Sequence, residues 1–229
     1  MENEIIFNPH SARYVHDKVL EALKGEKGKL LDIGAGEGEL AYKLQKLGFT
    51  DISCCDINPS KFKLSGIKCV QADLNESLPF SDDTFDIVTC TEVLEHLKDP
   101  FNAIAHISRV LKTGGKAVIT TPNIMNWYSR LRFLFNGYFN DYYLEEEFTK
   151  DSKLGHIHPF YFPQLKYFLE LNNLEIISLD ADKCPGISNF NMGKLSKGFI
   201  FYLFFHFFMK PKNKVLMEGN TLVLKVLKK

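Results

Sequence analysis

Three glycines at alternate positions follow a short apolar segment, and they constrain the fold more than any other feature of the chain. Residues 30–40 read LLDIGAGEGEL, with glycine at positions 34, 36 and 38. Glycine permits positive φ and leaves room for a ligand where a Cβ would stand, and a helix starting directly afterwards presents N–H groups at its positive end. An ordinary turn seldom needs three glycines. Residues 30–40 are therefore interpreted as a cofactor-binding loop.

The spacing of these glycines disfavours two common nucleotide-binding loops. A dinucleotide fingerprint, G-x-G-x-x-G, would place a third glycine where this chain has Glu39. A P-loop would close with lysine followed by serine or threonine, and residues 30–40 contain no such pair. The loop therefore indicates neither an NAD site nor an ATPase.

Two later segments each place an aspartate where a strand is expected to end. Segment 51–58 (DISCCDIN) contains Asp56, and segment 67–74 (IKCVQADL) contains Asp73. Open α/β sheets bind ligands outside the carboxyl ends of their strands, and a carboxylate there accepts hydrogen bonds from both hydroxyls of a ribose. Either aspartate is also compatible with a helix cap or a turn. Their order behind the glycine loop favours an adenosyl ligand.

Asp32 and the three glycines resemble the first motif, D-x-G-x-G-x-G, of class I S-adenosylmethionine-dependent methyltransferases. Residues 78–100 (LPFSDDTFDIVTCTEVLEHLKDP) resemble the fourth motif, and the resemblance extends over residues 28–182. It implies that the chain binds S-adenosylmethionine and releases S-adenosylhomocysteine. The cofactor contacts that it implies are Asp32, Gly34, Gly36, Gly38, Asp56, Ile57, Asp73, Leu74 and Cys90.

Alternating strand and helix segments predict an α/β fold with a parallel sheet and helices on both faces. The resemblance implies a Rossmann-like, mostly parallel sheet of about seven strands, the last two forming an antiparallel hairpin. Strands are expected near residues 29–33, 51–55, 68–71, 87–90, 116–121, 175–180 and 221–226. We expect a single domain over residues 1–229, with a lid at about 122–160 and an aromatic and basic insertion at about 184–214.

The string E-x-x-E-H at Glu92, Glu95 and His96 follows the fourth expected strand, where the resemblance places the acceptor pocket. A hydroxyl acceptor must lose its proton, and histidine titrates in the range that suits a general base. On a helix these residues would share a face, and together with His158 they are similar to the metal-binding set of small-RNA 3′-terminal 2′-O-methyltransferases. We therefore predict His96, Glu92 and His158 as catalytic residues. Metal-free relatives use the same string for packing or capping, so a divalent metal is the less favoured interpretation.

Aromatic and basic residues in the expected lid indicate the type of acceptor. They would stack on a ring, pair with an anionic group, or simply pack the lid. They are Trp127, Tyr128, Arg130, Arg132, Tyr138, Tyr142 and Tyr143. The segment resembles a stretch of methionine-biosynthesis-associated methyltransferase-like proteins and of methyltransferases of polysaccharide or lipid-linked sugar pathways, and the E-x-x-E-H string is similar to that of ubiquinone-biosynthesis O-methyltransferases. These resemblances favour a small-molecule, sugar or lipid-linked acceptor.

Two alternatives remain for the function. RNA methylation is disfavoured because the chain has a formal net charge of +0, whereas phosphate binding normally needs a basic surface. The third interpretation is a cofactor-binding partner protein without catalysis. An intact His96 and the aromatic lid favour an enzyme over this third alternative.

Cysteine usage and the N-terminal residues point to a reducing compartment. Five cysteines lie mostly in expected strands without a C-x-x-C pair, and we interpret them as buried, reduced thiols. Residues 1–15 (MENEIIFNPHSARYV) contain no apolar core of a secretory signal, so we expect a cytoplasmic protein.

The C-terminal fifth of the chain is basic, with nine lysines and one acidic residue over residues 183–229. Within it, residues 198–209 (GFIFYLFFHFFM) are apolar and flanked by lysines, but a bilayer span needs about 20 such residues. Residues 198–214 are therefore expected to make peripheral membrane contact, to pack against the domain, or to form a homodimer contact.

Overall fold

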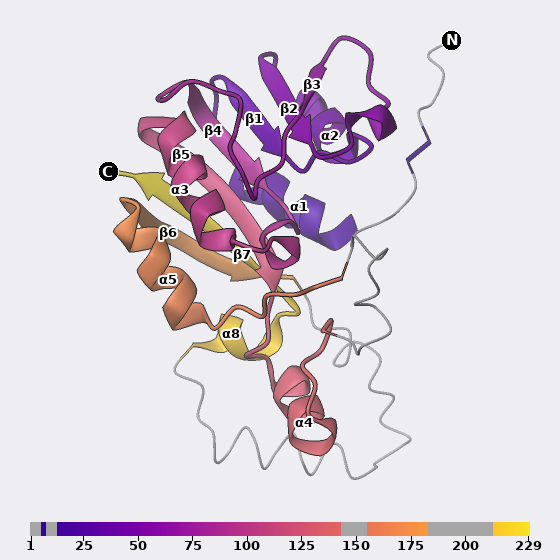
Figure 1. The fold of residues 1–229 in the computed structure, drawn as a ribbon, viewed down its shortest axis with the longest axis vertical. Helices are drawn as coiled ribbons and strands as arrows, with labels where there is room; N and C mark the ends of the chain where they lie inside the picture. The colour runs from indigo at the N-terminus through magenta and orange to yellow at the C-terminus, as the bar shows by residue number, and fades with distance from the viewer. Residues whose placement is uncertain (1–5, 8–12, 143–154, 183–212) are drawn as a thin grey trace.

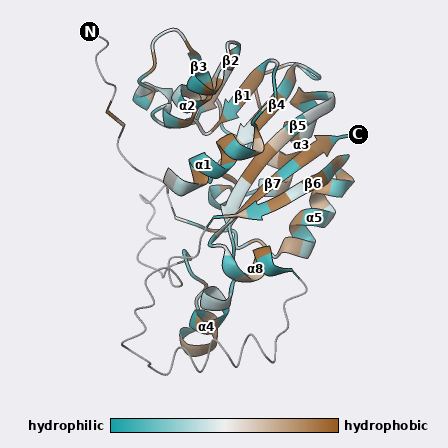
Figure 2. Ribbon diagram, turned by 180° about the vertical axis from the view of Figure 1, so that it is seen from behind, coloured by the Kyte–Doolittle hydropathy of each residue, from teal (hydrophilic) through white to brown (hydrophobic). Residues whose placement is uncertain are grey.

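The computed structural model has one twisted sheet at its centre, and Figures 1 and 2 show helices on both faces of this sheet. The structure describes residues 6–7, 13–142, 155–182 and 213–229. The strands are β1 (Leu30–Ile33), β2 (Ile52–Asp56), β3 (Lys68–Gln71), β4 (Phe85–Cys90), β5 (Leu111–Pro122), β6 (Leu174–Ala181) and β7 (Thr221–Lys228). They form a 7-stranded sheet in the order β3-β2-β1-β4-β5-β7-β6.

The direction of the strands confirms the expected fold class. Strands β1 to β5 pair in parallel, and β7 lies antiparallel between β5 and β6. Each expected strand is present, although β5 begins at Leu111 rather than near residue 116. The sheet is thus Rossmann-like and mostly parallel, with the expected antiparallel pair of β6 and β7 at one edge.

The helices divide between the two faces of the sheet. Their bounds are α1 (Arg13–Ala22), α2 (Glu39–Leu47), α3 (Pro100–Val110), α4 (Trp127–Asn136), α5 (Phe162–Leu171) and α8 (Lys214–Glu218), with short 3₁₀ turns η1 (Pro59–Lys61) and η2 (Leu94–His96). Helices α3 and α5 lie in front of the sheet in Figure 1, and α1 lies in front of it in Figure 2. No helix in the described part of the chain is long and apolar enough to cross a membrane.

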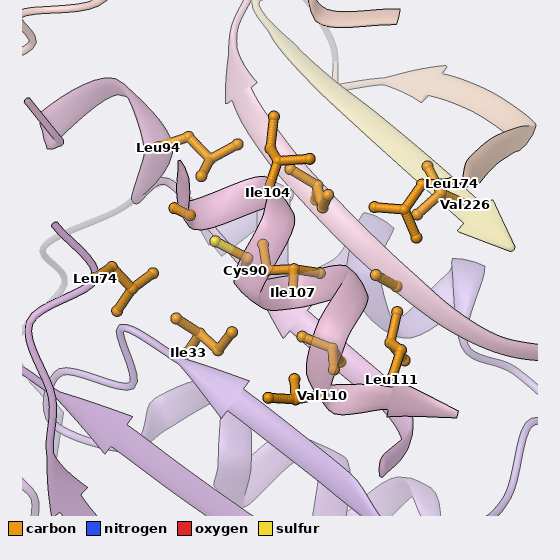
Figure 3. Close-up of a cluster of buried hydrophobic side chains, with 14 of the residues drawn as sticks. Ile33, Leu74, Cys90, Leu94, Ile104, Ile107, Val110, Leu111, Leu174 and Val226 are labelled. Carbon is orange, nitrogen blue, oxygen red and sulfur yellow. The ribbon is translucent and has the colours of Figure 1, made fainter. Parts of the chain in front are cut away.

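Two hydrophobic cores result from the period-2 alternation of side chains along the strands. Leu31 and Ile33 of β1 face the core that α3 and α5 cover, where Ile104 and Ile107 pack against Cys90 and other strand residues (Figure 3). Leu30 faces the other core, which α1 and α2 cover. Burial on both faces explains why the parallel strands are continuous apolar runs.

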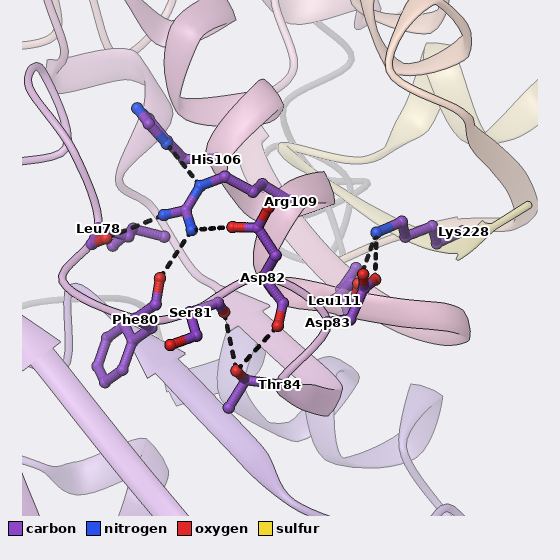
Figure 4. Close-up of polar contacts among 10 residues, drawn as sticks. All are labelled: Leu78, Phe80, Ser81, Asp82, Asp83, Thr84, His106, Arg109, Leu111 and Lys228. Carbon is purple, nitrogen blue, oxygen red and sulfur yellow. Dashed lines mark hydrogen bonds and ion pairs between the residues drawn. The ribbon is translucent and has the colours of Figure 1, made fainter.

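The loop between β3 and β4 carries Asp73 and Leu74 and is held in place by Arg109 of α3 (Figure 4). The guanidinium donates to the carbonyl oxygens of Phe80 at 2.7 Å and Leu78 at 2.9 Å, and to the Asp82 carboxylate at 2.7 Å. A planar guanidinium makes these bonds in fixed directions. Arg109 therefore holds residues 78–82 of this loop.

The expected lid and insertion lie only partly within the described residues. Helix α4 stands beyond the carboxyl end of β5, apart from the sheet, in both Figure 1 and Figure 2. Tyr143, Cys184 and residues 198–212, the main part of the expected membrane contact, lie outside the described residues. The single-domain boundary at 1–229 stays a prediction.

Replacing Arg109 by Met should lower the free energy of unfolding by about 2 kcal/mol, because it leaves part-buried carbonyl groups without their donor. Urea denaturation measures the difference. Lys166→Met is the matched control, because Lys166 makes an exposed pair with Glu170 at 3.6 Å and its loss should change stability by about 0.5 kcal/mol or less. Equal losses in the two variants would show that Arg109 does not hold the loop.

Candidate functional site

The glycine loop joins β1 to α2 in a left-handed backbone conformation. Gly34, Gly36 and Gly38 have φ values of 72°, 53° and 93°. A Cβ on Gly34 would collide with the side chain of Val93, and one on Gly38 would come within 2.8 Å of Phe62. At Gly36 a Cβ would meet nothing within 4 Å. Gly34 and Gly38 therefore permit close packing of the protein, whereas Gly36 borders open space at the carboxyl end of β1.

Asp56, at the end of β2, ties this loop to the neighbouring strand. Its carboxylate accepts hydrogen bonds from the backbone N–H of Gly36 and of Asn58, both at 2.8 Å. The backbone N–H groups of Gly34 and Ala35 donate to the Cys55 carbonyl at 2.9 and 3.1 Å. An ionised carboxylate has further lone pairs, so Asp56 retains acceptor capacity for hydroxyl groups. The expected ribose contact thus lies directly beside Gly36.

Asp73 and Leu74 follow β3 at the same edge of the sheet. The Asp73 carboxylate accepts hydrogen bonds from both the backbone N–H and the side-chain amide of Asn75 at 2.9 Å. Asp73 therefore stabilises a turn, which is one of the two roles expected for it. Leu74 is 5% exposed and belongs to the core in Figure 3. The side chain of Ile57 is 60% exposed. The expected roles of these residues toward a cofactor stay predictions.

Cys90 ends β4 with its side chain turned into the core (Figure 3), and it is fully buried. Burial raises the pKa of its thiol well above the usual range. A cofactor contact at this position would therefore come from the backbone of Cys90.

Asp32 is the most deeply buried carboxyl group of the glycine loop region, at 2% exposure. One of its oxygens accepts a hydrogen bond from the Thr89 hydroxyl at 2.7 Å, and the other has no hydrogen-bond partner among the described residues. Burial, reinforced by the nearby charge of Asp56, raises the pKa of Asp32 to about 7. A buried, unpartnered carboxylate oxygen favours a ligand that carries a donor or a positive charge.

Glu92 lies just beyond β4 in a strained, left-handed conformation with φ of 53°. Thr120 holds it there, since its hydroxyl accepts from the Glu92 N–H at 2.9 Å and donates to the carboxylate at 2.8 Å. Burial, reinforced by the charges of Asp182 and Asp141, raises the pKa of Glu92 to about 7. Glu92 is therefore a carboxyl group poised to exchange a proton near neutral pH.

Glu95 and His96 form the 3₁₀ turn η2, and the expectation that Glu92 shares a helical face with them is wrong. Glu95 is fully buried, and neither of its carboxylate oxygens has a hydrogen-bond partner among the described residues. The hydroxyl of Thr121 lies near this carboxylate without a well-formed hydrogen bond. Burial, and then the charge of Glu92, raises the pKa of Glu95 well above its usual range.

The structure brings His156, rather than the expected His158, next to Glu95 and His96. One candidate ligand atom from each of Glu95, His96 and His156 lies within 4.8 Å of the others, and the two imidazole rings meet edge to face at 4.7 Å. The Glu95 carbonyl accepts from the N–H groups of Ile157 and His158 at 2.8 and 3.0 Å, which fixes this chain segment against η2.

His158 itself is directed elsewhere. Its Nδ1 is 2.7 Å from the Leu97 carbonyl, and its own carbonyl accepts from the Tyr142 hydroxyl at 2.8 Å. A spacing argument from the sequence cannot distinguish His156 from His158. The catalytic role of His158 stays a prediction, whereas His156 is a site residue that the sequence prediction missed.

The expected acceptor residues are distributed between buried and exposed positions. Tyr142 is buried beside His156, with ring centroids 5.5 Å apart, and burial raises the pKa of its hydroxyl. Arg130 is partly buried, which lowers its pKa, and Arg132 donates to Asn140 at 3.1 Å. Tyr128 and Tyr138 are exposed on and just after α4. Of this set, Tyr142 is the residue that the structure places beside the histidines.

Comparison with known proteins gives a consistent result. The family model of a methyltransferase domain matches residues 7–179, which is more than half of the chain. A ubiquinone biosynthesis O-methyltransferase of Alkalilimnicola ehrlichii is 31% identical over 117 residues, covering 47% of this chain and 47% of that protein. A ubiquinone/menaquinone biosynthesis C-methyltransferase of Marinomonas is 36% identical over 103 residues, covering 39% and 41%. The chain thus spans about half the length of the curated relatives it matches.

Solved structures share the fold. A SAM dependent methyltransferase from Archaeoglobus fulgidus has a TM-score of 0.62 at 21% identity, covering 93% of this chain and 94% of that one. A putative methyltransferase from Bacillus halodurans has a TM-score of 0.63 at 19% identity, covering 92% and 97%. At these identities the likeness establishes the architecture alone.

The raised pKa of Asp32 gives a testable pH dependence. In the folded protein Asp32 ionises near pH 7, so between about pH 4 and pH 7 the folded state holds more protons than the unfolded state and this carboxyl lowers stability as pH rises. A cationic ligand group prefers the ionised form. Affinity for S-adenosylmethionine should therefore increase by up to about tenfold from pH 6 to pH 8.

Asp32→Asn should remove this dependence while keeping the side-chain volume. Equilibrium dialysis of both proteins across the pH range measures the effect. A parallel pH dependence in wild type and Asp32→Asn would show that another group is responsible.

Proposed function

Because the chain belongs to the methyltransferase domain family, we propose that it transfers a methyl group from S-adenosylmethionine to an oxygen atom of a small-molecule, sugar or lipid-linked acceptor. The observation that carries this proposal is the open space at Gly36 beside the Asp56 carboxylate, at the carboxyl ends of β1 and β2, together with the buried Asp32 carboxylate of β1, one oxygen of which has no hydrogen-bond partner among the described residues. This is where open α/β sheets bind nucleotide-like ligands.

The chain's own groups fit this cofactor. The unpartnered oxygen of Asp32 would accept from its ammonium group, and Asp56 would accept from its ribose hydroxyls. When bound, S-adenosylmethionine supplies an electrophilic methyl group on a sulfonium and leaves as S-adenosylhomocysteine. The protein must hold the acceptor oxygen in line with that methyl group and exclude water.

His96 and Glu92 are the groups placed to take the acceptor proton. They follow β4, the neighbour of β1 in the sheet, and so lie on the same carboxyl edge as the glycine loop. The pKa of Glu92 is raised to about 7, which suits proton transfer near neutral pH. A hydroxyl acceptor needs a group that takes its proton, so the presence of His96 and Glu92 supports methylation at oxygen.

A small-molecule or lipid-linked acceptor is supported by the functions of the relatives and by the lid. The relatives named above act in ubiquinone or menaquinone biosynthesis. Tyr142 packs beside His156 and would form one wall of the acceptor pocket. Quinone-like rings and lipid-linked sugars both suit an aromatic wall next to a proton acceptor.

RNA 2′-O-methylation assisted by a metal is the second candidate function. It is favoured by the grouping of Glu95, His96 and His156, which offers one carboxylate and two imidazoles to an ion. The net charge of the chain remains an argument against it. The third candidate is a partner protein that binds the cofactor without catalysis. Such a protein would transfer no methyl group, which distinguishes it from the two enzyme candidates.

Gly36→Val should reduce affinity for S-adenosylmethionine by at least about tenfold, because its Cβ fills the space beside Asp56. Gly66→Val is the matched control, since Gly66 also has positive φ (86°) and open surroundings but lies outside the loop. Calorimetric titration measures both affinities. Equal affinity losses in the two variants would mean that backbone strain, and not the cofactor site, causes the effect.

Methyl-labelled S-adenosylmethionine incubated with the protein and fractionated cell extract should place label in the lipid or small-molecule fraction. His96→Ala should reduce this transfer by about 100-fold while cofactor binding persists. Label in nuclease-sensitive material would favour RNA. Cofactor binding without any transfer would favour the partner protein.

A further inference from the structure

Arg130 of α4 is a partly buried cation to which the described residues offer no anion. Its guanidinium makes no hydrogen bond or ion pair with any described residue. Arg109 and Arg132, in contrast, donate to Asp82 at 2.7 Å and to Asn140 at 3.1 Å. Arginine keeps its charge at every physiological pH and carries five N–H donors. Arg130 therefore has its full donor capacity available for a ligand.

Aromatic rings, and not carboxylates, surround Arg130 in the chain. Residues 123–140 contain no aspartate or glutamate. Burial lowers the pKa of the guanidinium, and the titratable group of the described residues that acts against this effect is Tyr161, a phenol that is neutral at pH 7. Trp127 lies three positions earlier on the same side of the helix. The position thus combines a positive charge with ring surfaces.

The base of α4 is tied to the sheet, so Arg130 has a defined position. The Asn126 side chain accepts from the Ser129 N–H at 2.7 Å, and the Ser129 hydroxyl accepts from the Asn140 N–H at 2.9 Å. The Asn140 side chain donates to Asn220, the residue before β7, at 3.0 Å. Arg130 follows Ser129 directly and therefore belongs to the fixed part of the helix.

The segment that carries Tyr161 comes from the acceptor side of the site. The His158 N–H donates to the Glu95 carbonyl at 3.0 Å, which holds this segment against η2. Tyr161 follows three residues later, at most about 11 Å of extended chain. An acceptor with its hydroxyl at His96 would extend along this segment to reach Arg130.

We propose that Arg130 binds an oxyanion of the methyl acceptor, so that the acceptor is an anionic molecule methylated at a hydroxyl group. The inference rests on the proposed function, because it assigns a charge to the acceptor of that same site. A guanidinium forms paired hydrogen bonds with a carboxylate or with a phosphate group. A carboxylate would belong to a small organic acid, and a phosphate to a sugar phosphate or a lipid-linked acceptor.

The charge of the methylated product tests the inference on the full chain. Methyl-labelled S-adenosylmethionine and fractionated cell extract should give a labelled product that a strong anion exchanger retains at pH 7. Lowering the pH to about 2.5 should release a carboxylate product, because its acid group becomes protonated, whereas a phosphate product stays ionised and retained. The two sources of the oxyanion are thereby distinguished.

Arg130→Gln should raise the amount of active fraction needed for half-maximal transfer by at least about tenfold, with a maximal rate within about threefold of wild type. The reason is that the lost interaction holds the acceptor equally before and during transfer. Arg130→Lys keeps the charge without the paired donors and should give an intermediate value. Lys166→Gln is the matched control, because it removes one positive charge from an exposed position on α5 and should behave as wild type.

Cofactor binding separates this inference from the proposed function. Arg130→Gln should bind S-adenosylmethionine as tightly as wild type, and thermal unfolding checks that each variant is folded. The inference is overturned, with methyl transfer intact, if the labelled product passes the anion exchanger at pH 7 or if Arg130→Gln needs no more acceptor than Lys166→Gln. Cofactor binding by wild type without any transfer overturns the proposed function, and this inference with it.

Discussion

The site depends on the hydrogen bonds that fasten the loop after β1 to the end of β2. The Gly36 N–H donates to the Asp56 carboxylate, and the Gly34 N–H donates to the Cys55 carbonyl. These bonds join the carboxyl ends of the two adjacent parallel strands into one edge, which is called the rim below. Because β1 pairs with β2 on one side and β4 on the other, the rim also places the residues after β4 at the same edge. The φ of 53° at Gly36 is a left-handed conformation that favours glycine, and a Cβ at this position would extend into the open space.

Buried carboxyl groups along this rim perform different tasks according to their partners. One carboxylate oxygen of Asp32 accepts a hydrogen bond and the other has no partner among the described residues, whereas the Glu92 carboxylate accepts a hydrogen bond from the Thr120 hydroxyl. The Glu95 carboxylate accepts no hydrogen bond within the described part of the chain. Burying such groups lowers stability, which a protein tolerates where a ligand compensates for it. The differences in partnering distinguish Asp32, on the proposed cofactor side, from Glu92 and Glu95, on the proposed acceptor side.

The sequence allowed the fold, and the position of the glycine loop beside Asp56, to be predicted because their signals are local. The apolar run ending at Ile33, the glycines after it and the aspartate ending β2 each lie within a few residues of the contact they make. The acceptor side was predicted less well, because Glu92 adopts positive φ and η2 is a single 3₁₀ turn instead of a helix. The choice of His156 over His158 depends on hydrogen bonds to Glu95, about sixty residues earlier, and no periodicity in the sequence reports such a contact.

The position of β7 has a consequence for how the protein assembles. β7 lies between β5 and β6, although it follows both in the chain. While a nascent chain lacks β7, the edges of β5 and β6 expose backbone groups that later pair with it, and exposed edges invite pairing with other chains. The sheet is therefore complete only when β7 enters between them as the antiparallel partner of both strands.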